Sequence, residues 1–285
     1  MAGPGETTFG AGSRRPIRLV AIAAAAAAAS LLASPAAAQP QGALRRDTSL
    51  GLSVTTGIDF SSGRYGAPAD TEILVVPFSL RARKGPIRVS ATLPYLRLDG
   101  PANIVGGGEG GPIVIDPNAP TPRRVREGLG DLSLGLDVAI PPAGLAGFKV
   151  DLGVRLKLPT SARSRGLSTG KTDIGLIADI SRPVGKVSPF LTLGYRMPGD
   201  PAGFELRNTA IVSAGASATL GRLVAIGAYD YAGATSRLSF ESHSLFGALA
   251  APVAKQVTLT GYGSVGLSRG APDYGVGLLV TFRAR

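Results

Sequence analysis

The chain has 285 residues, of which 44% are hydrophobic, and this length suffices for one large domain or two small ones. Cysteine is absent and only one His occurs, which excludes disulfides, thiolate metal sites and clustered His ligands, so no cofactor or metal is expected. The formal charge of +11 leaves two classes of anionic partner open, nucleic acid and an anionic membrane surface.

Residues 1–38 have the features of a cleaved secretory signal peptide. Three arginines, at positions 14, 15 and 18, precede an apolar, mostly Ala run over 19–32, and the alanines at 36–38 suit a signal peptidase. A twin-arginine signal fits less well because Pro and Ile follow the Arg pair. An uncleaved anchor is the other alternative, but the run is shorter than the ~20 residues that cross a bilayer. We expect the mature chain to begin at Gln39, where 27 Lys and Arg against 18 Asp and Glu give a net charge of +9.

Beyond residue 38, the dominant pattern is an alternation of apolar and polar residues, which indicates β-strands with two unlike faces. The stretch FKVDLGVRLKL (148–158) has an apolar residue at every even position and four charges at odd positions. We predict twelve strands, near 48–60, 72–83, 86–98, 130–140, 148–158, 171–182, 188–197, 207–220, 223–233, 242–252, 256–268 and 274–282. The facing of the eighth, ninth and tenth strands is ambiguous because they are rich in Ala and Gly.

The connections between these strands alternate in length. Short turns follow the even-numbered strands, and longer segments follow the odd-numbered ones, the longest over 99–129. Short turns at one end and long loops at the other are typical of an outer-membrane barrel. We therefore predict an all-β fold, a twelve-stranded antiparallel transmembrane up-and-down β-barrel over 39–285. Its long loop, 99–129, is expected to be extracellular and able to gate or plug the mouth.

Alternation alone does not separate a membrane barrel from a periplasmic β-sandwich, which remains the alternative architecture. An Arg or Lys that faces lipid at mid-bilayer costs roughly 2–4 kcal/mol. Lys149, Arg155 and Lys157 share one face of the strand 148–158. In a barrel this face must therefore line the lumen, and the apolar face must meet the lipid of the outer membrane.

The predicted parity brings opposite charges together in the lumen. The group expected near the outer end is Asp131, Arg155, Lys157, Asp173 and Arg196. The group expected near the periplasmic end is Arg81, Arg83, Arg88, Asp137, Lys149, Asp151 and Asp179. With Asp59 and Asp230, the inward set has seven acidic and seven basic residues. Two interpretations stay open and can hold together: a constriction whose field selects solutes, and a ladder of ion pairs that ties the strands together.

Other charges and the aromatic residues fall near strand ends and loops. The arginines assigned to long loops are Arg123, Arg124, Arg126, Arg163 and Arg165, which could bind lipopolysaccharide phosphates or simply be solvated. Nucleic-acid binding is not expected, because the basic residues are dispersed without interleaved aromatic residues. The aromatic residues expected near the membrane interfaces are Phe60, Tyr95, Phe190, Tyr195, Tyr229, Tyr231 and Phe282.

Enzymatic activity is not expected. His243 and Ser244 are adjacent on a predicted strand, so their side chains should point to opposite faces and could not form a nucleophile–base pair. The stretch GGGEGGP (106–112) lacks the Lys-Ser/Thr of a phosphate-binding loop.

The chain ends in YGVGLLVTFRAR, in which Gly277, Val280 and Phe282 follow the spacing of the signal read by the outer-membrane barrel-insertion machinery. Three residues follow the aromatic one, where an aromatic terminus is usual.

Several segments, in order, resemble the meta-pathway phenol-degradation family of outer-membrane transporters. They are PYLRLDGPAN (94–103), GLGDLSLGL (128–136), KTDIGLIADISRPVG (171–185), YRMPGDP (195–201) and GLSRGAPDYGVGLLVTF (266–282). The resemblance implies a porin or transporter in the outer membrane of a Gram-negative bacterium, admitting small aromatic compounds, with no catalytic residues. We therefore expect a channel for passive uptake of small solutes. The alternative is a closed structural or adhesive barrel, and the oligomeric state stays open.

Overall fold

The computed structural model describes residues 50–101, 104–105, 113–114, 122–141, 145–161, 165–201 and 205–284. The predicted signal peptide, most of 102–121 and Arg163 lie outside the described residues. No helix long and apolar enough to cross a membrane occurs in the described part of the chain.

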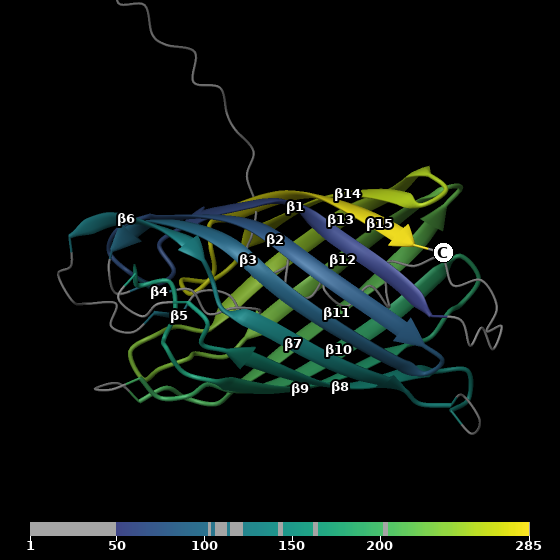
Figure 1. Ribbon diagram of the computed structural model, residues 1–285, viewed down its shortest axis with the longest axis horizontal. Helices are drawn as coiled ribbons and strands as arrows, with labels where there is room; N and C mark the ends of the chain where they lie inside the picture. The colour runs from purple at the N-terminus through teal and green to yellow at the C-terminus, as the bar shows by residue number, and fades with distance from the viewer. Residues whose placement is uncertain are drawn as a thin grey trace, which may run out of the picture.

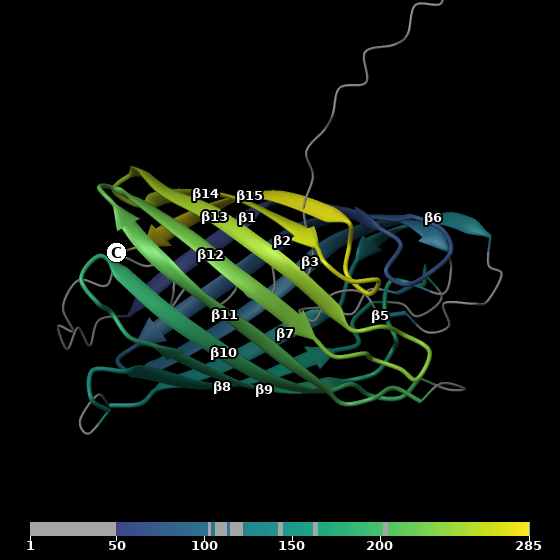
Figure 2. The same cartoon turned by 180° about the vertical axis from the view of Figure 1, so that it is seen from behind.

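The strands form a closed antiparallel barrel in chain order (Figures 1 and 2). They are β1 (Gly51–Gly63), β2 (Thr71–Lys84), β3 (Ile87–Pro101), β6 (Arg123–Leu129), β7 (Leu132–Ala139), β8 (Lys149–Leu158), β9 (Asp173–Ser181), β10 (Val187–Met197), β11 (Thr209–Leu220), β12 (Leu223–Ala232), β13 (Ser242–Ala254), β14 (Val257–Gly266) and β15 (Tyr274–Ala284). Pairing of β15 with β1 closes the ring, so the backbone groups within the barrel wall bond to one another and need no bond from lipid.

The elements β6 and β7 are two parts of one barrel strand. Both pair with β3, but the register changes by one residue between the pairs Tyr95–Leu129 and Thr92–Ser133. Gly130 and Asp131 therefore form a β-bulge, which inserts one extra residue opposite β3. Counting β6 and β7 together gives twelve barrel strands, which confirms the predicted fold class.

The loop predicted over 99–129 is shorter than expected. The β3 strand extends to Pro101, and β6 begins at Arg123, so the hairpin between them projects beyond the rest of the barrel (Figure 1). Between them, β4 (Ile104–Val105) pairs with β5 (Ile113–Val114). The sequence pattern misses this extension because the arginines of β6 do not alternate with apolar residues, as expected of a strand that has left the lipid.

The outer face of the barrel is apolar, and the charges are inside. Outward side chains that are more than 40% exposed include Leu80, Val154, Leu176, Leu249 and Leu278. In contrast, Asp131, Lys157 and Asp173 are between 3% and 5% exposed. A water-soluble sandwich would show the reverse, so the solvent that this face fits is lipid.

The strand β15 gives the height of this apolar belt. Its outward residues run from Tyr274 to Phe282, with aromatic side chains at both ends. Eight steps at ~3.3 Å each, tilted by about 40°, span roughly 20 Å, close to the height of the apolar band of known outer-membrane barrels.

The structure settles the facing of β11, β12 and β13, and shows that one side of the lumen is apolar. The inward side chains of β12 and β13 that pack into one buried cluster with Tyr262 are Val224, Ile226, Phe246, Ala248 and Ala250. Phe190 packs against this cluster from β10. Its prediction as an interfacial residue is therefore wrong: Phe190 has the same parity as the buried Thr192 and points inward.

A tyrosine crosses the neighbouring strand in this apolar part of the lumen. The Tyr262 hydroxyl donates to Asp59 Oδ2 at 2.5 Å, and the ring lies over Gly277. A Cβ at Gly277 would overlap the Tyr262 ring, so only glycine leaves room for this contact.

At the end of the barrel that has the longer loops, residues from two loops pack inside the mouth. A buried cluster joins residues that follow β1 and β8 to residues of β2 and β3: Tyr65, Ala67, Leu167, Ile73, Leu96 and Leu98. The Tyr65 hydroxyl donates to Ser61, and burial raises the pKa of this phenol above its ordinary value. The loop ends therefore fill part of the opening with apolar side chains.

Candidate functional site in the lumen

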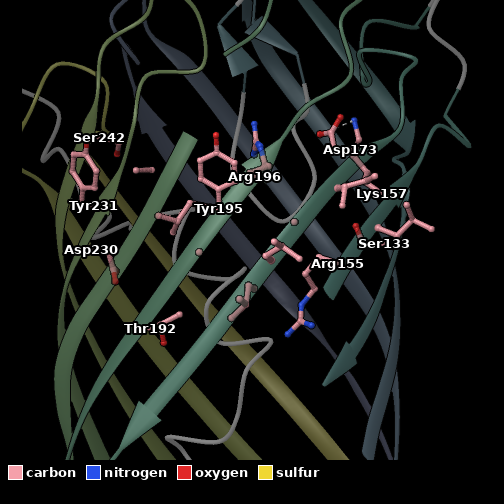
Figure 3. Close-up of a pocket in the computed structure, with 18 of the residues that line it drawn as sticks. Ser133, Arg155, Lys157, Asp173, Thr192, Tyr195, Arg196, Asp230, Tyr231 and Ser242 are labelled. Atoms are coloured by element: carbon pink, nitrogen blue, oxygen red, sulfur yellow. Dashed lines mark ion pairs between the residues drawn. The ribbon is translucent and has the colours of Figure 1, made fainter. Parts of the chain in front are cut away.

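A buried lysine joins three barrel strands near the end of the barrel that has the longer loops. Lys157 Nζ lies 3.3 Å from Asp131 Oδ2 and 3.3 Å from Asp173 Oδ2, which come from the bulge before β7 and from the start of β9. Figure 3 shows the Lys157–Asp173 pair at the upper level of the site. All three side chains are buried, and the lysine gives each of the two carboxylates an oppositely charged partner.

The same group holds the loop that follows β8. Ser168 Oγ donates to Asp131 Oδ2 at 2.5 Å, and the Ser161 amide donates to Asp131 Oδ1 at 3.0 Å. Lys157 Nζ also donates to Thr169 Oγ1. Sequence reasoning misses Ser168 and Thr169, because a loop has no periodicity that would show which side chains turn inward.

A second level of ion pairs lies nearer the end of the barrel that has the short turns. Arg155 Nη2 lies 2.7 Å from Asp137 Oδ1, and Arg88 Nη2 lies 3.2 Å from Asp151 Oδ1. The prediction that Arg155 belongs to the outer group is therefore wrong for its guanidinium, which reaches toward the short-turn end to a neighbouring strand. Gly153, which is paired with Asp137, leaves room for this contact, since a Cβ there would overlap the Asp137 carboxylate.

A row of hydrogen-bonded polar residues continues around the wall at this level. Thr192 Oγ1 donates to Asp179 Oδ1 at 2.5 Å, and Ser213 bonds to Asp230 on the next strand. Lys149, also predicted in this region, is half-buried at the start of β8. The wall at this level therefore presents carboxylates that already have partners in the chain.

Arg196 differs from the other lumenal cations. It is 7% exposed, and among the described residues no group accepts a hydrogen bond from its Nε or Nη2. The carboxylate whose field acts on it, Asp173, is engaged by Lys157 and by the Gly199 amide.

A cavity opens in the lumen between these levels (Figure 3). Its charged lining residues are Arg155 and Lys157 on β8, Asp173 on β9, Arg196 on β10 and Asp230 on β12.

A row of small and apolar residues crosses three strands of the same lining, β9, β10 and β11. Gly194 is paired with Ile177 on one neighbouring strand and with Ile211 on the other, and all three line the cavity. The cavity therefore has charged walls and a partly apolar floor.

The predicted rim arginines of β6 lie on a strand and not on the predicted loop. Arg123 pairs with Asp99 at 2.7 Å and donates to the Asp70 carbonyl. Arg124 is exposed.

Arg126 and Arg165 lie close to the same loop. Arg126 is half-buried and donates to the carbonyls of Gly166 and Pro101. Arg165 is exposed beside Gly128. Arg124 and Arg165 are thus the described rim arginines that are exposed and form no ion pair with Asp99.

His243 and Ser244 lie on opposite faces of β13, as their adjacency predicts. Ser244 is buried in the lumen, while His243 faces outward, bonded to Tyr229 and 3.3 Å from a Glu241 oxygen. The two side chains therefore do not form a nucleophile–base pair.

The remaining predicted residues lie mostly on the outer face. The aromatic residues exposed there are Tyr95, Tyr195, Tyr229 and Phe282, and Phe60 and Tyr231 are partly exposed. Of the C-terminal residues, Val280 and Phe282 face outward, whereas Gly277 faces the lumen under Tyr262.

Comparisons with known proteins assign no family. No family model matches the chain, and no curated protein matches it. Among solved structures it is similar to the CymD monoaromatic hydrocarbon channel, with 12% identity, a TM-score of 0.42 and coverage of 82% of this chain and 87% of that chain.

It is also similar to the translocator domain of autotransporter NalP from Neisseria meningitidis, with 14% identity, a TM-score of 0.47 and coverage of 91% and 96%. Outer membrane phospholipase A from Escherichia coli matches with 12% identity, a TM-score of 0.39 and coverage of 81% and 88%. Likenesses this distant carry no activity over to this chain. The class of the molecule therefore rests on its own closed sheet of twelve strands.

Proposed function

We propose that this protein is an outer-membrane barrel of a Gram-negative bacterium through which small solutes diffuse passively. The observation that carries the proposal is the inverted burial: charged side chains and a cavity lie inside, and an apolar belt lies outside. A barrel whose charged wall borders a lumenal cavity has the parts of a selective pore.

The ion pairs support both interpretations of the lumenal charges. Lys157 and its two carboxylates are almost fully buried and hold a loop, which is a structural role. Arg155, Arg196 and Asp230 border the cavity, where their fields act on a passing solute.

The test is conductance of the refolded barrel in planar bilayers, together with liposome swelling. The panel contains sugars, phenols and aromatic acids, since the sequence resemblance implies small aromatic compounds. Stepwise conductance and swelling with at least one solute class are expected. Correctly folded barrels that neither conduct nor admit any of these solutes would contradict the proposal.

A closed barrel is the second candidate, and the packed mouth favours it. Leu167 is 1% exposed and fills the opening together with Tyr65 and Leu98. Leu167→Gly should raise the open probability or the conductance if this cluster obstructs an otherwise complete pore. Leu238→Gly, at an exposed loop residue, is the control. If both the native barrel and Leu167→Gly are silent, the barrel is structural or adhesive.

We also propose that the exposed rim arginines contact lipopolysaccharide phosphates. Arg124 and Arg165 are the candidates by exposure, whereas Arg123 is engaged by Asp99. Replacing Arg124 and Arg165 with Gln should reduce the lipopolysaccharide that copurifies with the barrel. Arg222→Gln at a periplasmic turn is the matched control, and an equal reduction there would contradict a specific contact.

A further inference from the structure

Arg196 lines the cavity and has an unused hydrogen-bonding edge. Its Nε and Nη2 lie on the same edge of the guanidinium plane, and neither donates to any described residue. Both nitrogens are buried, so bulk water does not replace a partner, and a ligand reaches this edge when the side chain turns toward the cavity. A buried donor without an acceptor is costly, and a charged one more so.

The geometry of this edge fits one kind of acceptor. Two N–H groups that point in parallel from a planar guanidinium match the two oxygens of a carboxylate. The nearby Asp173 does not supply that contact, since Lys157 and the Gly199 amide already engage it. With the side chain turned toward the cavity, this edge is therefore suited to a carboxylate that comes from outside the chain.

The floor of the cavity suits a flat apolar body beside that carboxylate. One cross-strand row consists of Ile177, Gly194 and Ile211, and Gly175 is paired with Arg196 one step toward the outer end. Gly175 and Gly194 add no side chain of their own, and Ile211 packs close beside Gly194 while Ile177 borders it on the other strand. A flat surface of backbone and branched side chains accepts a planar group more readily than a bulky one.

We propose that the lumenal cavity binds small monocarboxylates with a planar apolar body, with the carboxylate on Arg196 and the body against Ile177, Gly194 and Ile211. This inference rests on the proposed function and deepens it, because it names the solute class of the same lumen. Binding itself does not require conduction, so the two can fail separately.

The test is isothermal titration of the refolded full-length barrel in detergent with three probes. Benzoate carries both features, benzamide lacks the charge, and cyclohexanecarboxylate lacks the planar ring. Benzoate should bind at least about tenfold more tightly than benzamide, the ratio expected for a charge-assisted bidentate hydrogen bond. Cyclohexanecarboxylate should fall between them.

Two variants of Arg196 and one control distinguish the effect of the bidentate guanidinium geometry from the effect of its charge. Arg196→Gln should lose about tenfold or more of the benzoate affinity, and Arg196→Lys should recover only part of it. Arg83→Gln removes the same charge from the periplasmic end of β2 and should leave binding unchanged. Gly175→Val places a branched side chain on the floor, close to Arg155, and should weaken benzoate binding.

The outcomes decide between the proposals. Equal affinity for benzoate and benzamide, or a loss with Arg83→Gln as large as with Arg196→Gln, would overturn the carboxylate site. Benzoate binding in a barrel that gives no conductance would uphold the site and contradict the channel. Conductance without benzoate binding would do the opposite.

Discussion

Lys157 is the residue on which the outer lumen depends most. It forms ion pairs with two carboxylates, Asp131 and Asp173, that are at most 4% exposed. Lys157→Met should therefore destabilise the barrel by about 3–5 kcal/mol, because it leaves two buried negative charges without this partner. The free energy of unfolding is measured by urea titration, in which the difference in electrophoretic mobility reports the folded and unfolded fractions of the barrel. Arg83→Met, at an exposed position, should change it by less than about 1 kcal/mol, and an equal loss would contradict this role.

Gly277 has a structural reason to be glycine that is independent of any insertion signal. Gly277→Ala would place a methyl group against the Tyr262 ring and displace the Tyr262–Asp59 hydrogen bond. We expect a loss of about 1–3 kcal/mol on refolding into detergent, where no insertion machinery is present. Gly227→Ala is the control, because nothing lies within 4 Å of its added Cβ. Normal refolding of Gly277→Ala in vitro with failed assembly in cells would instead assign Gly277 to the signal.

At the scale of the element, the strand β13 offers a direct test of which face meets lipid. Leu249 is 54% exposed near the middle of the strand, and Val253 is 60% exposed beside the periplasmic turn. Leu249→Arg should cost about 2–4 kcal/mol in lipid vesicles, and Val253→Arg only about 0–1 kcal/mol, since the cost of a charge falls toward the interface. Urea titration of folding in the same vesicles measures both. Equal effects at the two depths would contradict a membrane-spanning β13.

The strands are largely predictable from the sequence, because a period of two survives wherever one face meets lipid. Strands β8 and β9 keep apolar even positions throughout, and the structure places those side chains outward. The pattern fails where both faces are apolar or small, so the inward facing of Phe246 and Ala248 on β13 could not be predicted. It also does not show that β6 continues into β7, because the extra residue at the bulge of Gly130 and Asp131 shifts the alternation by one position.

The candidate site is predictable only in part, for a related reason. Alternation indicates which charges face inward, but it does not say how far a side chain reaches along the lumen. It therefore groups Arg155 with the outer charges by its position in β8, whereas its guanidinium pairs with Asp137 one level deeper. Alternation also places Ile177 on the inward face of its strand with Asp173 and Asp179, but it does not place Ile211, because the strand predicted over 207–220 is rich in Ala and its facing is ambiguous.

For the whole molecule, the predicted inward charges balance at seven of each sign, and this predicts weak selectivity between small ions. Arg155→Ala should then shift selectivity toward cations, because Asp137 loses its counter-ion while Asp151 and Asp179 remain nearby. The reversal potential in a KCl gradient measures the shift. The double variant Asp137→Asn with Arg155→Ala restores the balance and should return the potential toward the native value. If Arg155→Ala folds and conducts with an unchanged potential, the lumenal pairs hold the strands together and do not select solutes.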